Sequence, residues 1–369
     1  MRFGIGWRPE LGAGILANLD RIDVVEVLAE DFVSASRRKQ KALQFLSRLV
    51  PVVVHATSLG LASSEPTDRK RLDDLARVVA LIEPDFWSEH LAFVRASGTE
   101  VGHLAAPPRN AAILEGLIRN VTQARAVVGS GPLLENVATL VDPPLSTYDE
   151  ATWLNAVASE TGCPLLLDLH NLHANATNFG FDAHDVLARV RHEHIGAIHI
   201  AGGRRIEDHR LLDDHRHAVP PEVFQLLKAV DASAATLILE RDGNYPSIDF
   251  LLAEIDHARS VVATASSPSS FPAAALAAAP PPHPPSSPSL LAFLARLYTN
   301  DDALARFSAA PAREAIAAGL LPEEGDALSR INADDLAAAA RSFARKRQGR
   351  GRAVPTRWYE RLFPASRVQ

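Results

Sequence analysis

The chain has 369 residues, one cysteine (Cys163) and a formal net charge of −6. A single cysteine excludes an intrachain disulfide and a metal site built from several thiolates. No uncharged apolar run approaches the about 20 residues of a membrane-spanning helix, and the N-terminus turns polar too early for a signal peptide. We expect a cytoplasmic protein that binds neither membranes nor nucleic acid, because residues 1–262 are acidic overall.

Eight short apolar runs recur along residues 1–262, and helix-like stretches separate them. The runs have the length and composition of buried strands. They lie at residues 3–7, 24–28, 52–54, 86–88, 133–134, 165–167, 197–198 and 236–239. Alternating strands and helices imply parallel strands with right-handed crossovers. Eight such units predict an α/β fold of the closed (β/α)8 TIM-barrel type, with an open sheet as the alternative on this pattern alone.

The composition changes sharply after the predicted barrel. Residues 263–288 are rich in Pro, Ala and Ser and carry no charge, which is typical of a linker. Helical patterns, with Asn300 and Asn332 as N-caps, then predict a small all-α domain over residues 289–347. Its role is left open between engagement of a peptide or partner and a solubility or dimerisation module. Residues 348–369 are basic and predicted to form a flexible tail.

Six of the eight apolar runs end in a side chain that can bind a metal ion. These side chains are His55, His90, Glu135, Asp168, His199 and Glu240. Asp213 and His215 follow the seventh run two residues apart, so they would point the same way in an extended segment. In a parallel barrel all these groups converge at one rim. Because carboxylates in one pocket repel each other unless cations neutralise them, the pattern predicts more than one metal ion.

The predicted ligands are nitrogen and oxygen atoms without sulfur, a set that suits Fe, Mn or Zn. A lone histidine at a strand end is more often a hydrogen-bonded structural residue. Eight candidate ligands at one rim are much harder to explain in that way. His170, Asn171 and His173 follow the sixth run, and we expect His170 and His173 to orient ligands.

Six motifs occur along the chain in a fixed order: GWRPE at 6–10, SEHL at 88–91, LEN at 134–136, LDLHN at 167–171, IHIAG at 198–202 and DDH at 213–215. They resemble the successive motifs of the multinuclear non-haem iron-dependent oxidative enzymes. That family includes the methanobactin-forming oxidase and related peptide-modifying enzymes. The resemblance covers roughly residues 1–260. It implies a barrel with two or three iron ions as mixed Fe(II)/Fe(III), O2 as co-substrate, and a ribosomally made, cysteine-containing precursor peptide.

Carried over by position, the resemblance implies eight iron ligands: His55, His90, Glu135, Asp168, His199, Asp213, His215 and Glu240. Within this set we predict catalytic roles for Asp168, His199 and Asp213. Asn171 matches a family asparagine near the metals. The chain departs from the family pattern at four positions, with His170 in place of asparagine, His173 in place of an aromatic residue, and Phe179 and Gly203 where histidine is frequent.

The resemblance thus predicts an iron-dependent, O2-using oxidase that modifies a precursor peptide at cysteine. Family members usually depend on a separate peptide-recognition protein, which is a candidate partner here. The first alternative is a divalent-metal barrel isomerase or an endonuclease-like hydrolase, since those barrels also surround a pocket with His, Asp and Glu. The second is a non-catalytic metal-binding scaffold that presents the helical domain to a partner.

Overall fold

The computed structural model describes residues 1–206, 210–231, 235–265 and 288–350. Eight parallel strands close into a barrel in the order β1-β12-β9-β8-β7-β4-β3-β2. The predicted (β/α)8 barrel is therefore confirmed, and the open sheet is not. The strands are β1 Arg2–Gly6, β2 Val24–Leu28, β3 Val52–His55, β4 Trp87–His90, β7 Leu133–Glu135, β8 Leu165–Asp168, β9 Ile195–Ile200 and β12 Thr236–Leu239.

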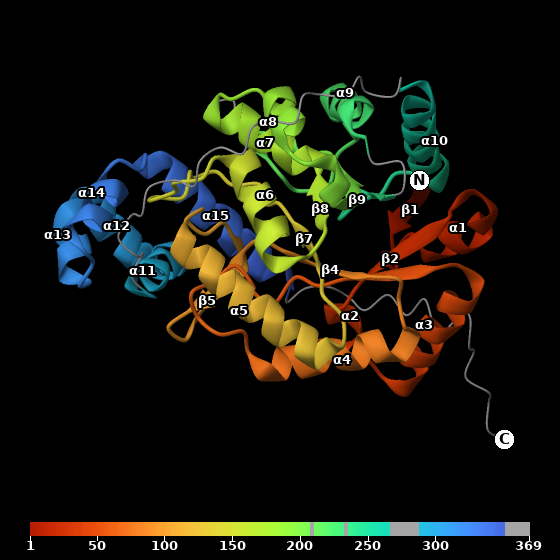
Figure 1. The fold of residues 1–369 in the computed structure, drawn as a ribbon, viewed down its shortest axis with the longest axis horizontal. Helices are drawn as coiled ribbons and strands as arrows, with labels where there is room; N and C mark the ends of the chain where they lie inside the picture. Colours follow the sequence, from red (N-terminus) through yellow and green to blue (C-terminus); the bar gives the residue numbers. More distant parts are fainter. Residues whose placement is uncertain (207–209, 232–234, 266–287, 351–369) are drawn as a thin grey trace.

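Helices cover the outside of this barrel (Figure 1). They are α1 Gly12–Ala17, α2 Glu30–Val33, α3 Arg37–Leu49, α4 Arg69–Ile82, α5 Ala111–Val128, α6 Glu150–Thr161, α7 Leu169–Phe179, α8 Ala183–Arg189, α9 Pro221–Ala229 and α10 Ile248–Thr264, with 3-10 turns at Leu19–Arg21 and His192–His194. Local sequence sets their ends. Asn110 caps the first turn of α5 through its side chain, and Gly129 ends that helix with a positive φ.

The register of the strands brings the predicted ligands to one rim. His90 pairs with Glu135, and Asp168 pairs with His199. Successive side chains of a strand point to opposite faces, so the residues two positions before these ligands also face the barrel interior. Before Glu135, Asp168 and His199 these residues are Leu133, Leu166 and Ala197, which form a small buried apolar cluster of their own, whereas the residue two positions before His90 is Ser88. The interior therefore consists of a polar layer at the rim above an apolar layer.

Two hairpins that the sequence analysis did not predict follow barrel strands. After β4, strands β5 Phe93–Ala96 and β6 Thr99–Ala105 pair antiparallel. Ser97 and Gly98 link them with positive φ angles of 45° and 77°, as a two-residue hairpin turn requires. After β9, the two-residue strands β10 Arg204–Arg205 and β11 Leu211–Leu212 pair in the same way.

A helical region follows the barrel, as predicted. It consists of α11 Pro288–Thr299, α12 Asp301–Ala309, α13 Pro311–Ala317, α14 Pro322–Ser329 and α15 Ala333–Arg350. Asn300 caps α12 as expected, through a bond from the backbone of Ala303. Helix α15 continues past residue 347, where we expected the helical domain to end. Most of the predicted linker (residues 266–287) and of the predicted tail (residues 351–369) lies outside the described residues. No described helix is both long and apolar enough to cross a membrane.

The helical region packs against the β5–β6 hairpin beside the barrel through α11 and α15 (Figure 1). Arg347 on α15 donates to the carbonyl oxygens of Val101 (2.8 Å) and Tyr298 (3.2 Å). The ring of Phe343 lies between those of His103 and Tyr298, with centroids 5.2 and 4.9 Å away. Contacts far apart in sequence therefore fix α15 to the hairpin.

Gly102 offers a test of this packing. Its φ is +74°, and an added Cβ atom would overlap the Cγ atom of Arg347. Gly98 in the same hairpin has a φ of +77° with open space around the position, so it is the matched control. Gly102→Ala should lower the free energy of unfolding by about 1–3 kcal/mol more than Gly98→Ala, because only the former meets α15. Thermal unfolding and protease sensitivity of α11–α15 measure this, and equal effects of the two variants would contradict the packing.

Candidate metal centre

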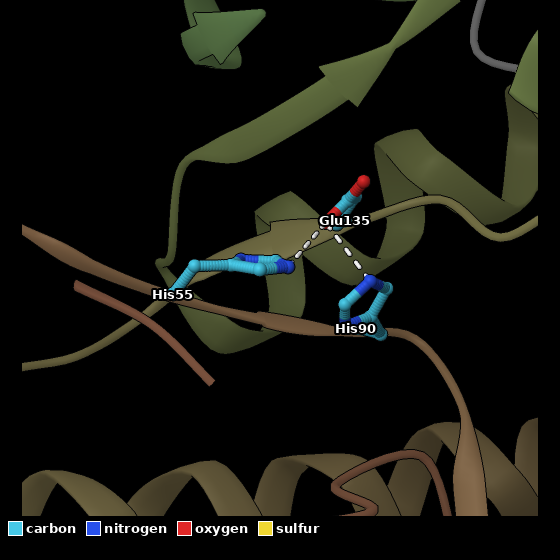
Figure 2. Close-up of side chains that lie close together, drawn as sticks. All are labelled: His55, His90 and Glu135. Atoms are coloured by element: carbon cyan, nitrogen blue, oxygen red, sulfur yellow. Dashed lines mark ion pairs between the residues drawn. The ribbon is translucent and has the colours of Figure 1, made fainter. Parts of the chain in front are cut away.

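The first group of candidate ligands comes from the ends of β3, β4 and β7. His55 Nε2 lies 3.5 Å from Glu135 Oε2, and His90 Nε2 lies 3.2 Å from the same oxygen. Figure 2 shows both imidazoles directed at this oxygen, while the other oxygen of Glu135 points away from them. All three side chains are buried, so water does not compete for the space between them.

The second group shares Glu135 with the first and adds Asp168, His199 and Glu240. His199 Nδ1 lies 3.3 Å from Glu135 Oε1 and 3.2 Å from Glu240 Oε2. The ligand atoms of this group lie within 4.8 Å of one another. Because the two oxygens of Glu135 face different groups, this carboxylate can bridge two metal ions.

The third group consists of His170, Asp213 and His215. Asp213 Oδ1 lies 3.0 Å from His170 Nδ1 and 2.7 Å from His215 Nε2. His215 also connects this group to the second, since its Nδ1 lies 3.1 Å from Glu240 Oε2. The structure thus brings all eight predicted ligands into one continuous centre and adds His170, which we had expected only to orient ligands.

The other two uncertain residues lie outside the three groups. Asn171 donates from its backbone nitrogen to Asp168 Oδ1 (2.7 Å) and from its side chain to the carbonyl oxygen of Asn136 (2.9 Å). It therefore supports Asp168, which caps α7 with one oxygen and leaves the other for the centre. The ring centroid of His173 lies 6.5 Å from that of His170, and His173 lines a groove between α7, α8 and α9.

His170 packs directly against Gly203. A Cβ atom at position 203 would overlap the carbonyl oxygen of Leu212 and would lie 2.6 Å from His170 Cε1 and 2.8 Å from its Nε2. His170 and Gly203, two of the four positions at which the chain departs from the family pattern, are therefore neighbours in space. The imidazole of His170 occupies the space that a side chain at position 203 would need.

Several buried polar atoms of the centre make no well-aligned hydrogen bond among the described residues, even where an ion-pair partner lies nearby. They include both oxygens of Glu135, Asp168 Oδ2, His90 Nδ1, His170 Nε2, His199 Nδ1 and His215 Nε2. Buried polar atoms are almost always hydrogen-bonded in folded proteins, so a concentration of unpaired ones indicates a missing ligand. Converging carboxylate oxygens and imidazole nitrogens fit first-row transition-metal ions.

Supporting residues fix the orientation of the imidazoles. Glu26 Oε2 lies 3.0 Å from His199 Nε2, and both side chains are fully buried. Ser88 Oγ lies 2.8 Å from His55 Nδ1. Such partners hold a ligating histidine in one tautomer and strengthen it as a ligand. The sequence analysis missed Glu26, although a charged residue inside the apolar run 24–28 was an available signal.

Three buried imidazoles, those of His90, His199 and His215, hold protons more tightly than free histidine does. Burial by itself lowers the pKa of His199, but nearby carboxylates, chiefly Glu26 and Glu240, raise it well above its usual value. Burial also opposes the charge of His90, but Glu135, Glu89 and Glu240 together outweigh it and raise the pKa of His90 to about 9. Without a metal ion, protonated imidazoles therefore neutralise the carboxylates.

Asp168 is the carboxylate whose pKa moves upward. Burial raises its pKa to about 7, although the charge of His215 acts in the opposite direction. The pKa of Glu135 is lowered instead, because the neighbouring imidazoles outweigh its burial. At neutral pH the centre thus stores protons on its imidazoles and partly on Asp168, and a metal ion must displace them.

Comparison with known proteins gives one family and several relatives. A family model described as "RiPP precursor modification enzyme MbnB/TglH/ChrH" matches residues 2–263. A UPF0276 protein of Bordetella bronchiseptica is 34% identical over 269 residues, which cover 71% of this chain and 93% of that protein. A UPF0276 protein of Streptomyces avermitilis is 36% identical over 272 residues, and the alignment spans 71% of this chain but only 55% of that protein.

Solved structures resemble this chain only at low sequence identity and with TM-scores below 0.5. D-psicose 3-epimerase from Clostridium cellulolyticum is 14% identical with a TM-score of 0.49, covering 72% of this chain and 99% of that chain. Endonuclease IV from Thermus thermophilus is 16% identical with a TM-score of 0.47, covering 70% and 99% of the two chains.

The shared carboxylate leads to a prediction on metal content. Glu135→Gln replaces one bridging oxygen by an NH2 group that cannot bind a metal ion, so two sites should weaken together. We expect the variant to retain at least about one metal ion fewer per chain than the wild type after reconstitution with Fe(II). Elemental analysis measures the content and circular dichroism checks the fold. Glu115→Gln, on an exposed position of α5, is the control, and unchanged metal content in Glu135→Gln would refute the bridge.

The stored protons lead to a second prediction. Metal ions bind deprotonated ligands, so Fe(II) binding under anaerobic conditions at neutral pH should release protons. The apparent affinity should rise as the pH increases through about 7 and about 9, the pKa values of Asp168 and His90. Titration calorimetry in two buffers of different ionisation enthalpy counts the protons. Proton uptake, or an affinity independent of pH across this range, would contradict the assignment.

Proposed function

Because the chain belongs to the family of RiPP precursor modification enzymes MbnB/TglH/ChrH, we propose that it is an iron-dependent, O2-using oxidase that modifies a ribosomally synthesised precursor peptide at cysteine. The observation that carries this proposal is the carboxylate of Glu135 between two buried ligand groups. A nitrogen and oxygen ligand set suits iron, and a shared carboxylate suits two neighbouring ions.

Under this proposal the three groups would hold two or three iron ions. The first ion would take His55, His90 and Glu135, the second Glu135, Asp168, His199 and Glu240, and the third His170, Asp213 and His215. Within this set, Asp168, His199 and Asp213 remain our catalytic candidates. When bound, iron supplies the redox chemistry with O2 and lowers the pKa of a coordinated thiol.

The third group is the most accessible part of the centre. The side chains of Asp213 and His215 are 20% and 12% exposed, whereas those of Asp168 and His199 are fully buried. A peptide side chain arriving from solvent would therefore meet the third group first. The inner groups stay shielded from water, which protects reactive intermediates from side reactions.

Arg8 positions two carboxylates, those of Glu240 and Asp242, that lie beside His215. Its buried guanidinium donates to Asp242 Oδ1 from Nε at 2.8 Å and lies 3.6 Å from Glu240 Oε1. Burial opposes its charge, but Asp242 and Glu240 outweigh this and raise the pKa of Arg8. Arg8 therefore keeps a permanent positive charge that orients Glu240.

The thiol of the reaction must come from the substrate. Cys163, the single cysteine of the chain, is 2% exposed and lies before β8, at the end of the barrel opposite to the metal centre. Burial raises the pKa of its thiol, and Arg125 donates to its sulfur at 3.3 Å. A buried thiol of raised pKa is a poor nucleophile and a poor metal ligand.

Oxygen consumption tests the proposal. The iron-reconstituted protein should consume O2 only when given a cysteine-containing peptide, for which short peptides encoded beside the gene are the first choice. Asp168→Ala and His199→Ala should each abolish turnover, because each removes a ligand from the buried second group and leaves unpaired charge. His184→Ala, at an exposed position, is the control.

Two outcomes would overturn this function. Turnover at the wild-type rate in either ligand variant would place the site elsewhere. A Zn or Mg form that is active on a sugar or a nucleic acid, with no O2 consumption by the iron form, would favour the isomerase or hydrolase. Metal content and circular dichroism of each variant are measured alongside, so that loss of metal is separated from loss of fold.

A further inference from the structure

A small cavity lies between helix α15 and the rim of the barrel and reaches the third ligand group. Its volume is about 40 Å³. Ser342, Phe343 and Lys346 line it from α15, His103 lines it from β6, and Asp213 of the metal centre lines it from the barrel. The C-terminal helical region therefore forms one wall of a cavity that adjoins the most accessible part of the centre.

Two polar groups of α15 face this cavity with unused hydrogen-bonding capacity. Ser342 and Lys346 are four residues apart, so they lie on the same face of the helix. Ser342 is 5% exposed, and its hydroxyl makes no hydrogen bond within the described ranges. Lys346 Nζ donates to His103 Nε2 at 2.8 Å, and no carboxylate of the described chain lies within 4.0 Å of it. Its ammonium group thus has two further N–H donors and no counter-ion.

Two contacts fix helix α15, which forms this wall of the cavity, to the hairpin and the barrel. Arg347, next to Lys346, donates to the carbonyl oxygen of Val101 on the hairpin at 2.8 Å. Near the start of α15, Asp335 forms an ion pair with Arg210 from the loop that precedes β11. These contacts fix Ser342 and Lys346 relative to Asp213, so the cavity is preformed.

We propose that this cavity binds a carboxylate of the peptide substrate, with Lys346 as its ionic partner and Ser342 as a second donor. The inference rests on the proposed peptide-modifying function. A cavity needs about 10–15 Å³ by this measure to hold one water molecule, so this one has room for a group of a few non-hydrogen atoms such as a carboxylate. Asp213 also adjoins the cavity, but its Oδ1 faces His170 Nδ1 and His215 Nε2 at 3.0 and 2.7 Å, and an ion held by this group would offset its charge.

The carboxylate can be the C-terminus of the peptide or an acidic side chain beside the modified cysteine. In either case it would place the thiol close to the third ligand group. The helical region would then select the substrate within the site itself, rather than recruit it from a distance. The family match at residues 2–263 does not extend to this region, so the subsite would be a feature added to the barrel.

Three thiol probes test the inference on the full-length protein under anaerobic conditions, where no turnover occurs. N-acetylcysteine has a terminal carboxylate, N-acetylcysteinamide has none, and N-acetyl-aspartyl-cysteinamide has only a side-chain carboxylate. Titration calorimetry should give a dissociation constant about tenfold lower for at least one carboxylate probe than for the amide, as expected for charge-assisted hydrogen bonds. The tighter carboxylate probe identifies the source of the group.

Matched variants assign this preference to α15. Lys346→Met should remove the tenfold difference, Lys346→Arg should keep most of it, and Ser342→Ala should reduce it. Arg341→Met changes an exposed cation next to Ser342 and should leave it intact. Equal binding of all three probes by the wild type, or a preference that survives in Lys346→Met, would overturn the inference.

Two further readouts keep the result interpretable. Protease resistance of α11–α15 shows whether this region still packs against the hairpin in Lys346→Met. If the packing is lost in that variant, Ser342→Ala decides instead, and an undiminished preference of Ser342→Ala for the carboxylate probes overturns the inference. The binding assay needs neither O2 nor turnover. Peptide oxidation without any carboxylate preference would therefore refute this inference alone, and a Lys346-dependent preference without any peptide oxidation would refute the proposed function alone.

Discussion

The structure depends on one electrostatic constraint: the carboxylate of Glu135 is buried between two groups of imidazoles and further carboxylates at the rim of a closed barrel. An apolar layer that includes Leu133 and Leu166 seals the interior below it, so water cannot reach these charges from that side. The negative charge of these carboxylates must therefore be neutralised by groups inside the barrel. Protonated His90 and His199 can do so, and metal ions can replace their protons.

The same constraint explains how much the sequence could predict. Six of the eight apolar runs end in a polar side chain, and this local pattern is enough to predict both these strands and their convergence at one rim. Glu26 was missed because it lies inside a run, two residues before the end of β2, whereas the predicted ligands were sought at the ends of runs. The β5–β6 hairpin was missed because its only strong signal is the dipeptide Ser97-Gly98.

Contacts between segments that are far apart along the chain could not be predicted from the sequence. A linker-like composition suggested that the helical region could lie anywhere within reach of the barrel. The contacts of Arg347 with the β5–β6 hairpin, and of Asp335 with Arg210, join positions more than a hundred residues apart. Only in three dimensions does α15 become a wall beside Asp213. The barrel and the helical region thus share a surface that neither could provide alone.

The close approach of His170 to Gly203 bears on how this centre could evolve. A side chain at position 203 would overlap both the backbone carbonyl oxygen of Leu212 and the imidazole of His170, so substitutions at positions 170 and 203 are coupled and not additive. A change at position 170 alone would leave the overlap with Leu212 in place. A family member with a side chain at 203 must therefore place the backbone around position 212 differently. The exchange at these two positions is thus a change of loop backbone as well as of side chains.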